Sequence, residues 1–207
     1  MTKPLQLFSD LLDVARGRAP DDLGPAQRLR LAATAALSSL GFAAAWGVAA
    51  GATDPMLALG NAAKVPMVVL FSALAAVPAG MLAHRLSGST ESTRGMLLSF
   101  SGCVFVGTLV AAVLAPLVAV YYLTSAWAGP YLGMGSAFLA VGVAGLLFIR
   151  GALRSEDRRA RLIPKLVIAA VTLGVMPQFI HLASPILPEH TPFDEGIDVV
   201  DTVREVR

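Results

Sequence analysis

Five segments of membrane-spanning length contain no Asp, Glu, Lys or Arg. They occupy residues 31–52, 65–83, 96–123, 131–149 and 166–187. A helix that crosses the roughly 30 Å hydrocarbon layer needs about 20 apolar residues, and lipid offers no hydrogen-bond partner to a backbone that is not helical. The sequence therefore predicts an all-α fold, a polytopic transmembrane helix bundle with five spans.

The composition argues against a soluble protein with buried helices. Hydrophobic residues make up 56% of the chain and charged residues only 14%. Five helices that are apolar on every side would need a polar shell around them, and this chain has too few polar residues to build one. The single cysteine, Cys103, lies within the third span, so no disulfide can form within the chain.

Two segments flank the membrane domain of residues 31–187. The N-terminal segment, 1–30, begins with apolar residues at helical spacing, and the C-terminal segment, 188–207, is an acidic tail. The spaced residues are Leu5, Phe8, Leu12 and Ala15. This pattern predicts an N-terminal amphipathic helix, which either lies on the membrane surface or packs against the bundle or another subunit.

The distribution of basic residues predicts the orientation of the chain. Of the 16 Lys and Arg residues, three lie in the first loop and the C-terminal tail: Lys64, Arg204 and Arg207. The rest precede the first span or lie in the second and fourth loops, on the opposite side. Because loops rich in Lys and Arg stay in the cytoplasm, we expect a cytoplasmic N-terminus and a periplasmic C-terminus. With its Ala- and Arg-rich composition, this predicts a multi-pass protein of the bacterial inner membrane.

The fourth loop, residues 150–165, is predicted to be the main basic segment. Its cationic residues are Arg150, Arg154, Arg158, Arg159, Arg161 and Lys165. Attraction to anionic lipid contributes about 1 kcal/mol for each basic residue near the surface, so anchoring and topology explain the loop. A cytoplasmic partner with an acidic patch is the alternative. Nucleic acid is not an expected partner, because the loop lacks interleaved aromatic residues.

Aromatic and small residues indicate where the spans meet the membrane surface and one another. Rings flank the third loop at Tyr121, Tyr122, Trp127 and Tyr131, as in an interfacial belt. Small residues recur at four-residue spacing at Gly47 and Gly51 in the first span, and at Ser136, Ala140 and Ala144 in the fourth. Such faces allow close helix packing, either within the bundle or against another protein.

Reactive groups are scarce within the spans. Gln178 and His181 share one face of the fifth span, and His84 lies at the inner end of the second, where it is expected to anchor the helix at the interface. His181 is either a hydrogen-bonded structural histidine or a ligand for haem or a metal. The chain has no HExxH, GxxxxGK[ST], GxSxG or CxxC motif. We therefore expect neither an enzyme nor a bound cofactor or metal.

Short segments along the chain carry a family resemblance. Asp22, Leu23, Gly24 and Pro25 precede the first span, residues 59–66 read LGNAAKVP, and the end of the chain carries Phe179, Pro185 and Phe193. With five spans, the chain resembles the Yip family of small multipass membrane proteins, including its bacterial members. The resemblance implies the same topology and a non-enzymatic role in organising membranes or partners. The vesicle trafficking of eukaryotic members, which contact prenylated small GTPases, is not implied for a bacterial chain.

Three functions are compatible with the sequence. The preferred hypothesis is a non-enzymatic scaffold, assembly factor or accessory subunit of a membrane complex, whose partners are membrane lipids and other membrane subunits or further copies of itself. The first alternative is a small channel or carrier subunit. The second is a cofactor-bearing membrane anchor of a redox complex, with His181 as axial ligand.

Overall fold

The computed structural model is all-helical and describes residues 3–16, 24–89, 91–125, 128–153 and 157–186. The described residues form six helices and no strand. They are α1 (Lys3–Ala15), α2 (Pro25–Ala50), α3 (Pro55–Leu86), α4 (Thr93–Thr124), α5 (Ala128–Leu153) and α6 (Arg158–Ala183). Helices α2 to α6 are each long and apolar enough to cross a membrane. The predicted fold class is therefore confirmed, and the chain is a multi-pass membrane protein.

The helix boundaries follow local chemistry. Pro25 and Pro55 occupy first-turn positions, where a missing N–H costs nothing. The carboxylate of Asp54 accepts a 2.8 Å hydrogen bond from the Met56 backbone N–H and caps α3. The Ser92 hydroxyl accepts one of 3.1 Å from the Gly95 N–H and caps α4. With these caps the helices begin several residues before the uncharged segments, so the helices are longer than the predicted spans.

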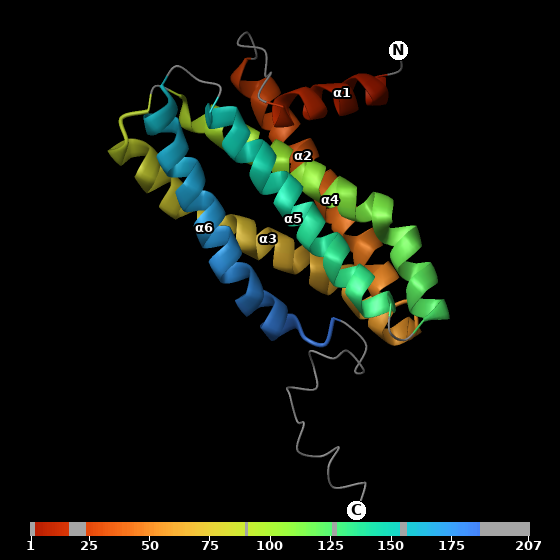
Figure 1. Ribbon diagram of the computed structural model, residues 1–207. Helices are drawn as coiled ribbons and strands as arrows, with labels where there is room; N and C mark the ends of the chain where they lie inside the picture. The colour runs from red at the N-terminus through yellow and green to blue at the C-terminus, as the bar shows by residue number, and fades with distance from the viewer. Residues whose placement is uncertain (1–2, 17–23, 90, 126–127, 154–156, 187–207) are drawn as a thin grey trace, which may run out of the picture.

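Five helices form an elongated bundle, and α1 lies across one end of it (Figure 1). Helix α2 packs along both α3 and α4, α4 packs along α5, and α3 packs along α6. Helices α3 and α4 barely touch each other, and α5 and α6 meet over a shorter stretch. The helices thus form a ring, in the order α2, α4, α5, α6 and α3, and among neighbours in this ring α5 and α6 form the weakest contact.

Small residues allow the close approaches between these helices. A Cβ on Gly47 would overlap the backbone carbonyl of Asn61 in α3, and a Cβ on Gly80 would overlap the side chain of Ile168 in α6. A Cβ on Gly107 in α4 would lie 2.8 Å from the Ala140 carbonyl oxygen in α5. Lipid tails are as apolar as the surface of a helix, so the hydrophobic effect does not drive membrane helices together. Close packing of small residues is instead a main source of helix association.

Helix α1 packs on the bundle through its apolar face. Leu11, Val14 and Ala15 are almost fully buried, and the Phe8 ring meets the Phe105 ring of α4 edge-to-face at 5.6 Å. Gly102 makes room for α1, because a Cβ there would lie 3.0 Å from the Val14 side chain. Of the two arrangements expected for the amphipathic helix, the structure has the one in which it packs against the bundle.

Candidate functional site

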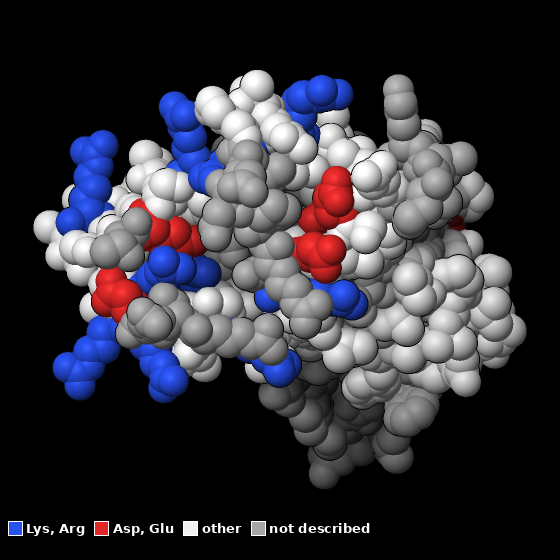
Figure 2. Space-filling model, turned by 90° about the horizontal axis from the view of Figure 1, so that it is seen from above, with Lys and Arg blue, Asp and Glu red and all other residues white. Residues whose placement is uncertain are grey.

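The end of the bundle where α1 lies is strongly basic. The end-on view in Figure 2 shows Lys and Arg side chains gathered there, with several acidic side chains among them. The basic residues at this end are Arg16, Arg28, Arg30, Arg85, Arg94, Arg150, Arg158, Arg159, Arg161 and Lys165. Within the described chain, the one ion pair closer than 4.0 Å joins Arg16 to Asp13. Most of these basic side chains are exposed.

The predicted fourth loop is mostly helix, which corrects that prediction. Arg150 lies in the last turn of α5, and Arg158 to Lys165 form the first two turns of α6. Arg154 lies outside the described residues. Both helices extend beyond the uncharged segments. Basic side chains are well solvated in the headgroup region, so a helix that leaves the hydrocarbon layer can continue through them.

Lys165 is the unusual member of the basic group, because it is buried. Its side chain is 3% exposed, and its Nζ lies 5.1 Å from the centroid of the Phe148 ring in α5. A Cβ on Gly151 would lie 3.4 Å from the same Nζ, so the ammonium rests against the backbone of α5 near the end of that helix. A buried ammonium is costly unless other groups offset its lost hydration.

His84 is also buried, which corrects the expectation of an interfacial anchor. It lies in the last turn of α3, is 6% exposed, and its Nδ1 has no hydrogen-bond partner among the described residues. Helices α3 and α6 are antiparallel, with Phe71 stacked near Phe179 and Gly80 against Ile168. The same register places His84 level with Lys165.

A second polar contact lies toward the opposite end of the bundle. Asn61 is fully buried and donates a 2.6 Å hydrogen bond from its Nδ2 to the backbone carbonyl of Ile186, just beyond α6. Lys64 donates from its Nζ to the Pro185 carbonyl over 2.9 Å. Lys64 was expected in the first loop, but it lies in the third turn of α3. This pair fastens the end of α6 to α3.

Sequence reasoning missed the buried polar residues of α3. Asn61 and Ser72 are buried on one side of this helix, about three turns apart, and His84 is buried about three turns further on, roughly 120° around the helix from Ser72. Each carries a buried atom with no partner in the described chain, namely Asn61 Oδ1, Ser72 Oγ and His84 Nδ1. The spacing of 11 residues between Asn61 and Ser72, close to three full turns, was a usable signal. Because α3 is apolar around most of its circumference, no periodicity in hydropathy singled these residues out.

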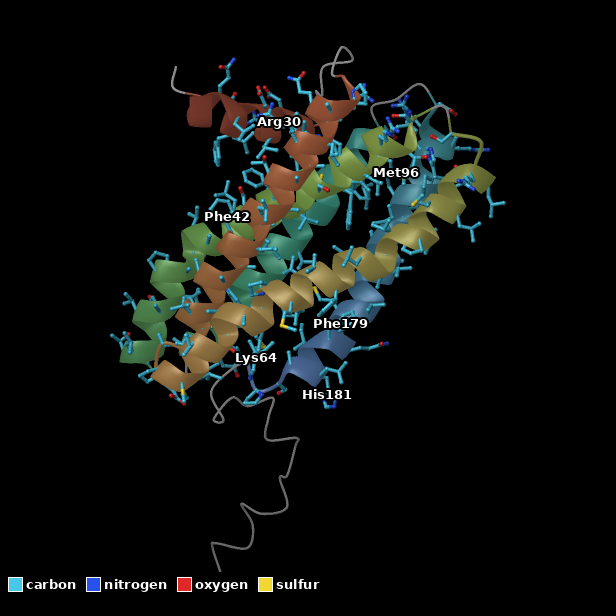
Figure 3. The ribbon with its side chains drawn as sticks, turned by 180° about the vertical axis from the view of Figure 1, so that it is seen from behind. Arg30, Phe42, Lys64, Met96, Phe179 and His181 are labelled. Atoms are coloured by element: carbon cyan, nitrogen blue, oxygen red, sulfur yellow. The ribbon has the colours of Figure 1, made fainter. Side chains whose placement is uncertain are left out.

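The predicted polar pair Gln178 and His181 lies on the outside of α6. Both side chains are exposed, and Figure 3 shows His181 at the far end of α6, pointing away from the bundle. Ala170 and Gly174 are exposed on the same face, at the preceding four-residue intervals. Because His84 lies at the other end of the bundle, no second described histidine comes close enough to share a haem or metal with His181.

The predicted small-residue faces are used within the bundle. Gly47 and Gly51 pack on the start of α3, against Asn61 and Ala58. Ser136, Ala140 and Ala144 face the other helices. Ser136 accepts a 2.8 Å hydrogen bond from the Nε1 of Trp46, and the other two pack on Gly107. These residues are therefore not open to a further protein.

Two of the predicted interfacial rings are open to the surroundings, and one is not. Tyr121 is 42% exposed and Tyr131 is 43% exposed, on either side of the turn between α4 and α5. Tyr122 is instead 6% exposed and packs on Gly129 and Gly133, which corrects its assignment to the belt. Trp127 lies outside the described residues.

Comparison with family models, with curated proteins and with solved structures found no match to this chain. The resemblance to the Yip family therefore stays a prediction. Among the described residues, no group of three or more His, Cys, Asp or Glu side chains is placed to hold a metal ion.

Proposed function

We propose that this chain is a non-enzymatic accessory or scaffold subunit that binds another membrane protein through the outer face of α6. The observation that carries the proposal is the poor coverage of this helix. Its buried residues are Pro164, Lys165 and Ile168, all in its first half. Beyond them, no described residue of α6 is buried, although the helix continues to Ala183.

The uncovered face of α6 has the chemistry of a helix contact. Ala170 and Gly174 are small enough to let a second helix approach closely, and Gln178 follows one turn later with an amide that can bond across the contact. Facing lipid alone, that amide would lack partners, which is unfavourable in hydrocarbon. A partner helix satisfies the amide and covers the small residues at the same time.

The proposed orientation places the basic end in the cytoplasm of a bacterial cell. The support is the excess of Lys and Arg at the α1 end, since positively charged segments are retained on the cytoplasmic side. The face of α6 that carries Gln178 and His181 then reaches the periplasmic half of the membrane.

Site-directed crosslinking in native membranes tests the proposed contact. A photoreactive residue at Gly174 should crosslink to a discrete membrane protein, whereas one at Gly142, equally open on α5, should yield lipid adducts. Gly174→Leu should abolish co-purification of that protein while leaving the amount of this chain unchanged. Lipid adducts alone at Gly174, together with purification of this chain by itself, would refute the proposal.

A channel or carrier is the second candidate function, and the buried polar residues of α3 favour it. Its three unpartnered groups, from Asn61 through Ser72 to His84, are distributed along most of the helix. The contact of Ile168 with Gly80 lies between Ser72 and His84 along the helix. Solute or proton flux into proteoliposomes that contain only this chain, raised by Ile168→Ala and lost in Ser72→Leu, would favour transport over a subunit role.

A further inference from the structure

The ammonium of Lys165 lacks a negative partner within the described chain. No described carboxylate lies within 4.0 Å of its Nζ. Its electrostatic neighbours are Glu91, before α4, and Cys103 and Arg161. Arg161 adds a second positive charge one turn away, and its Nε is buried with no partner among the described residues.

His84 adds a third unsatisfied group to this part of the bundle. Its position in the last turn of α3 is level with Lys165 in the register set by the Phe71–Phe179 and Gly80–Ile168 contacts, and its ring nitrogen Nδ1 is buried and unpartnered among the described residues. The three side chains come from two helices that pack tightly through Gly80 and Ile168. A single carboxylate, Glu91, does not balance two cations, and buried groups of this kind are normally satisfied by a partner.

The position of the ammonium indicates where a partner would come from. The Cα of Lys165 is about 10 Å along α6 from the start of that helix at Arg158. Its side chain reaches back to Gly151, two residues before the end of α5. The Nζ thus lies close to the headgroup region, at the weak contact between α5 and α6.

We propose that Lys165, Arg161 and His84 form a site for a phosphate-bearing anion at the junction of α3, α5 and α6. Lys and Arg donate charge-assisted hydrogen bonds to phosphate oxygens, and basic sites between membrane helices take lipid headgroups in this way. The phosphate belongs either to an anionic phospholipid, which enters from the bilayer, or to a soluble phosphate, which enters from the aqueous side. Both sources present the same chemistry to Lys165.

Thermal unfolding in nanodiscs of defined lipid tests the site and distinguishes the sources. The intact protein is placed in phosphatidylcholine alone, in phosphatidylcholine mixed with phosphatidylglycerol, and in phosphatidylcholine with added inorganic phosphate. Stabilisation by phosphatidylglycerol should be lost in Lys165→Met. It should persist in Arg159→Gln, which removes an equal charge from an exposed position on the same helix. Loss of one basic contact should weaken binding about fivefold or more.

Each outcome of this experiment bears on the proposal. A shift given by inorganic phosphate, and lost in Lys165→Met, supports the site and identifies the soluble source. Equal shifts in Lys165→Met and in the unmodified protein overturn it, as does the absence of any shift with both probes. If Lys165→Met does not fold, Arg161→Gln must show the same weakened response, and an unchanged response in that variant overturns the proposal.

Discussion

The indole Nε1 of Trp46 in α2 donates a 2.8 Å hydrogen bond to the Oγ of Ser136 in α5, two helices that are separated in the bundle by α4. Ser136 in turn donates to the Gly133 carbonyl over 2.7 Å, so both polar groups are satisfied in a buried position. This bond spans the half of the bundle farthest from α1, where Trp46 packs with alanines of α2 and α4.

A double-mutant cycle measures what this bond contributes. Ser136→Ala leaves the indole N–H buried without a partner, and Trp46→Phe removes the donor. We expect each to lower the free energy of unfolding by about 1 kcal/mol or more. The coupling between them should be about 0.6 kcal/mol and not above about 1.7 kcal/mol, as for hydrogen bonds within membranes. Unfolding in mixed micelles by SDS titration gives these values, and strict additivity would contradict a bond between the two side chains.

The crossing of α2 and α3 depends on one glycine and not on another. Gly47→Ala places a methyl group against the Asn61 carbonyl, while Gly41→Ala places it in open space on the same helix. Overpacking should cost Gly47→Ala about 1–3 kcal/mol of unfolding free energy. Gly41→Ala should stabilise the helix by up to about 1 kcal/mol, because alanine is the better helix former.

The comparison of these two glycines is made by SDS titration of the purified variants. Both glycines lie in the interior of α2, so helix propensity alone predicts stabilisation of both variants. A stabilised Gly47→Ala variant would show that α2 and α3 are farther apart than the structure has them.

The number and placement of the spans could be predicted from the sequence, because an apolar segment in lipid satisfies its backbone hydrogen bonds by forming a helix. The rotation of each helix could not. A helix such as α4, apolar on every side, has no polar face to mark which residues are buried, and Tyr122 was accordingly misplaced. Burial of His84 and Lys165 was missed for a related reason. A basic residue near the end of a span is usually interpreted as a surface anchor, yet here neighbouring helices bury both side chains, and the Lys165 ammonium lies against α5.

Reactivity of the one cysteine should report whether α1 stays on the bundle. Cys103 is 2% exposed, and its Sγ lies 3.8 Å from the Ala15 carbonyl oxygen at the end of α1. Leu11→Asp puts a charge into the contact between α1 and α4, which costs several kcal/mol unless the helix moves away. We expect at least about tenfold faster labelling of Cys103 by a maleimide in this variant.

Ser9→Asp is the matched control for the α1 experiment, because Ser9 is exposed on the same helix. It adds the same charge and should leave the labelling rate of Cys103 unchanged. Equal acceleration by both substitutions would show that charge on α1, and not its apolar contact, controls access to the thiol.

Residues at the two ends of the bundle should be accessible from opposite sides of the membrane. Thr53 lies in the turn between α2 and α3, and Arg159 lies in the first turn of α6, with three spanning helices between them. Three crossings place the two positions in different compartments. An impermeant maleimide should therefore label Thr53→Cys from one side of sealed vesicles and Arg159→Cys from the other, while the buried Cys103 gives little background.

The charge distribution adds a direction to that result. Because most of the Lys and Arg residues lie at its end of the bundle, Arg159→Cys should label from the cytoplasmic side, in inverted vesicles. Thr53→Cys should label in right-side-out vesicles of the same cells. The reversed pattern would preserve the five-span fold and overturn the proposed orientation. Labelling of both positions from one side would mean that one or all three of α3, α4 and α5 do not cross, although each is long and apolar enough to do so.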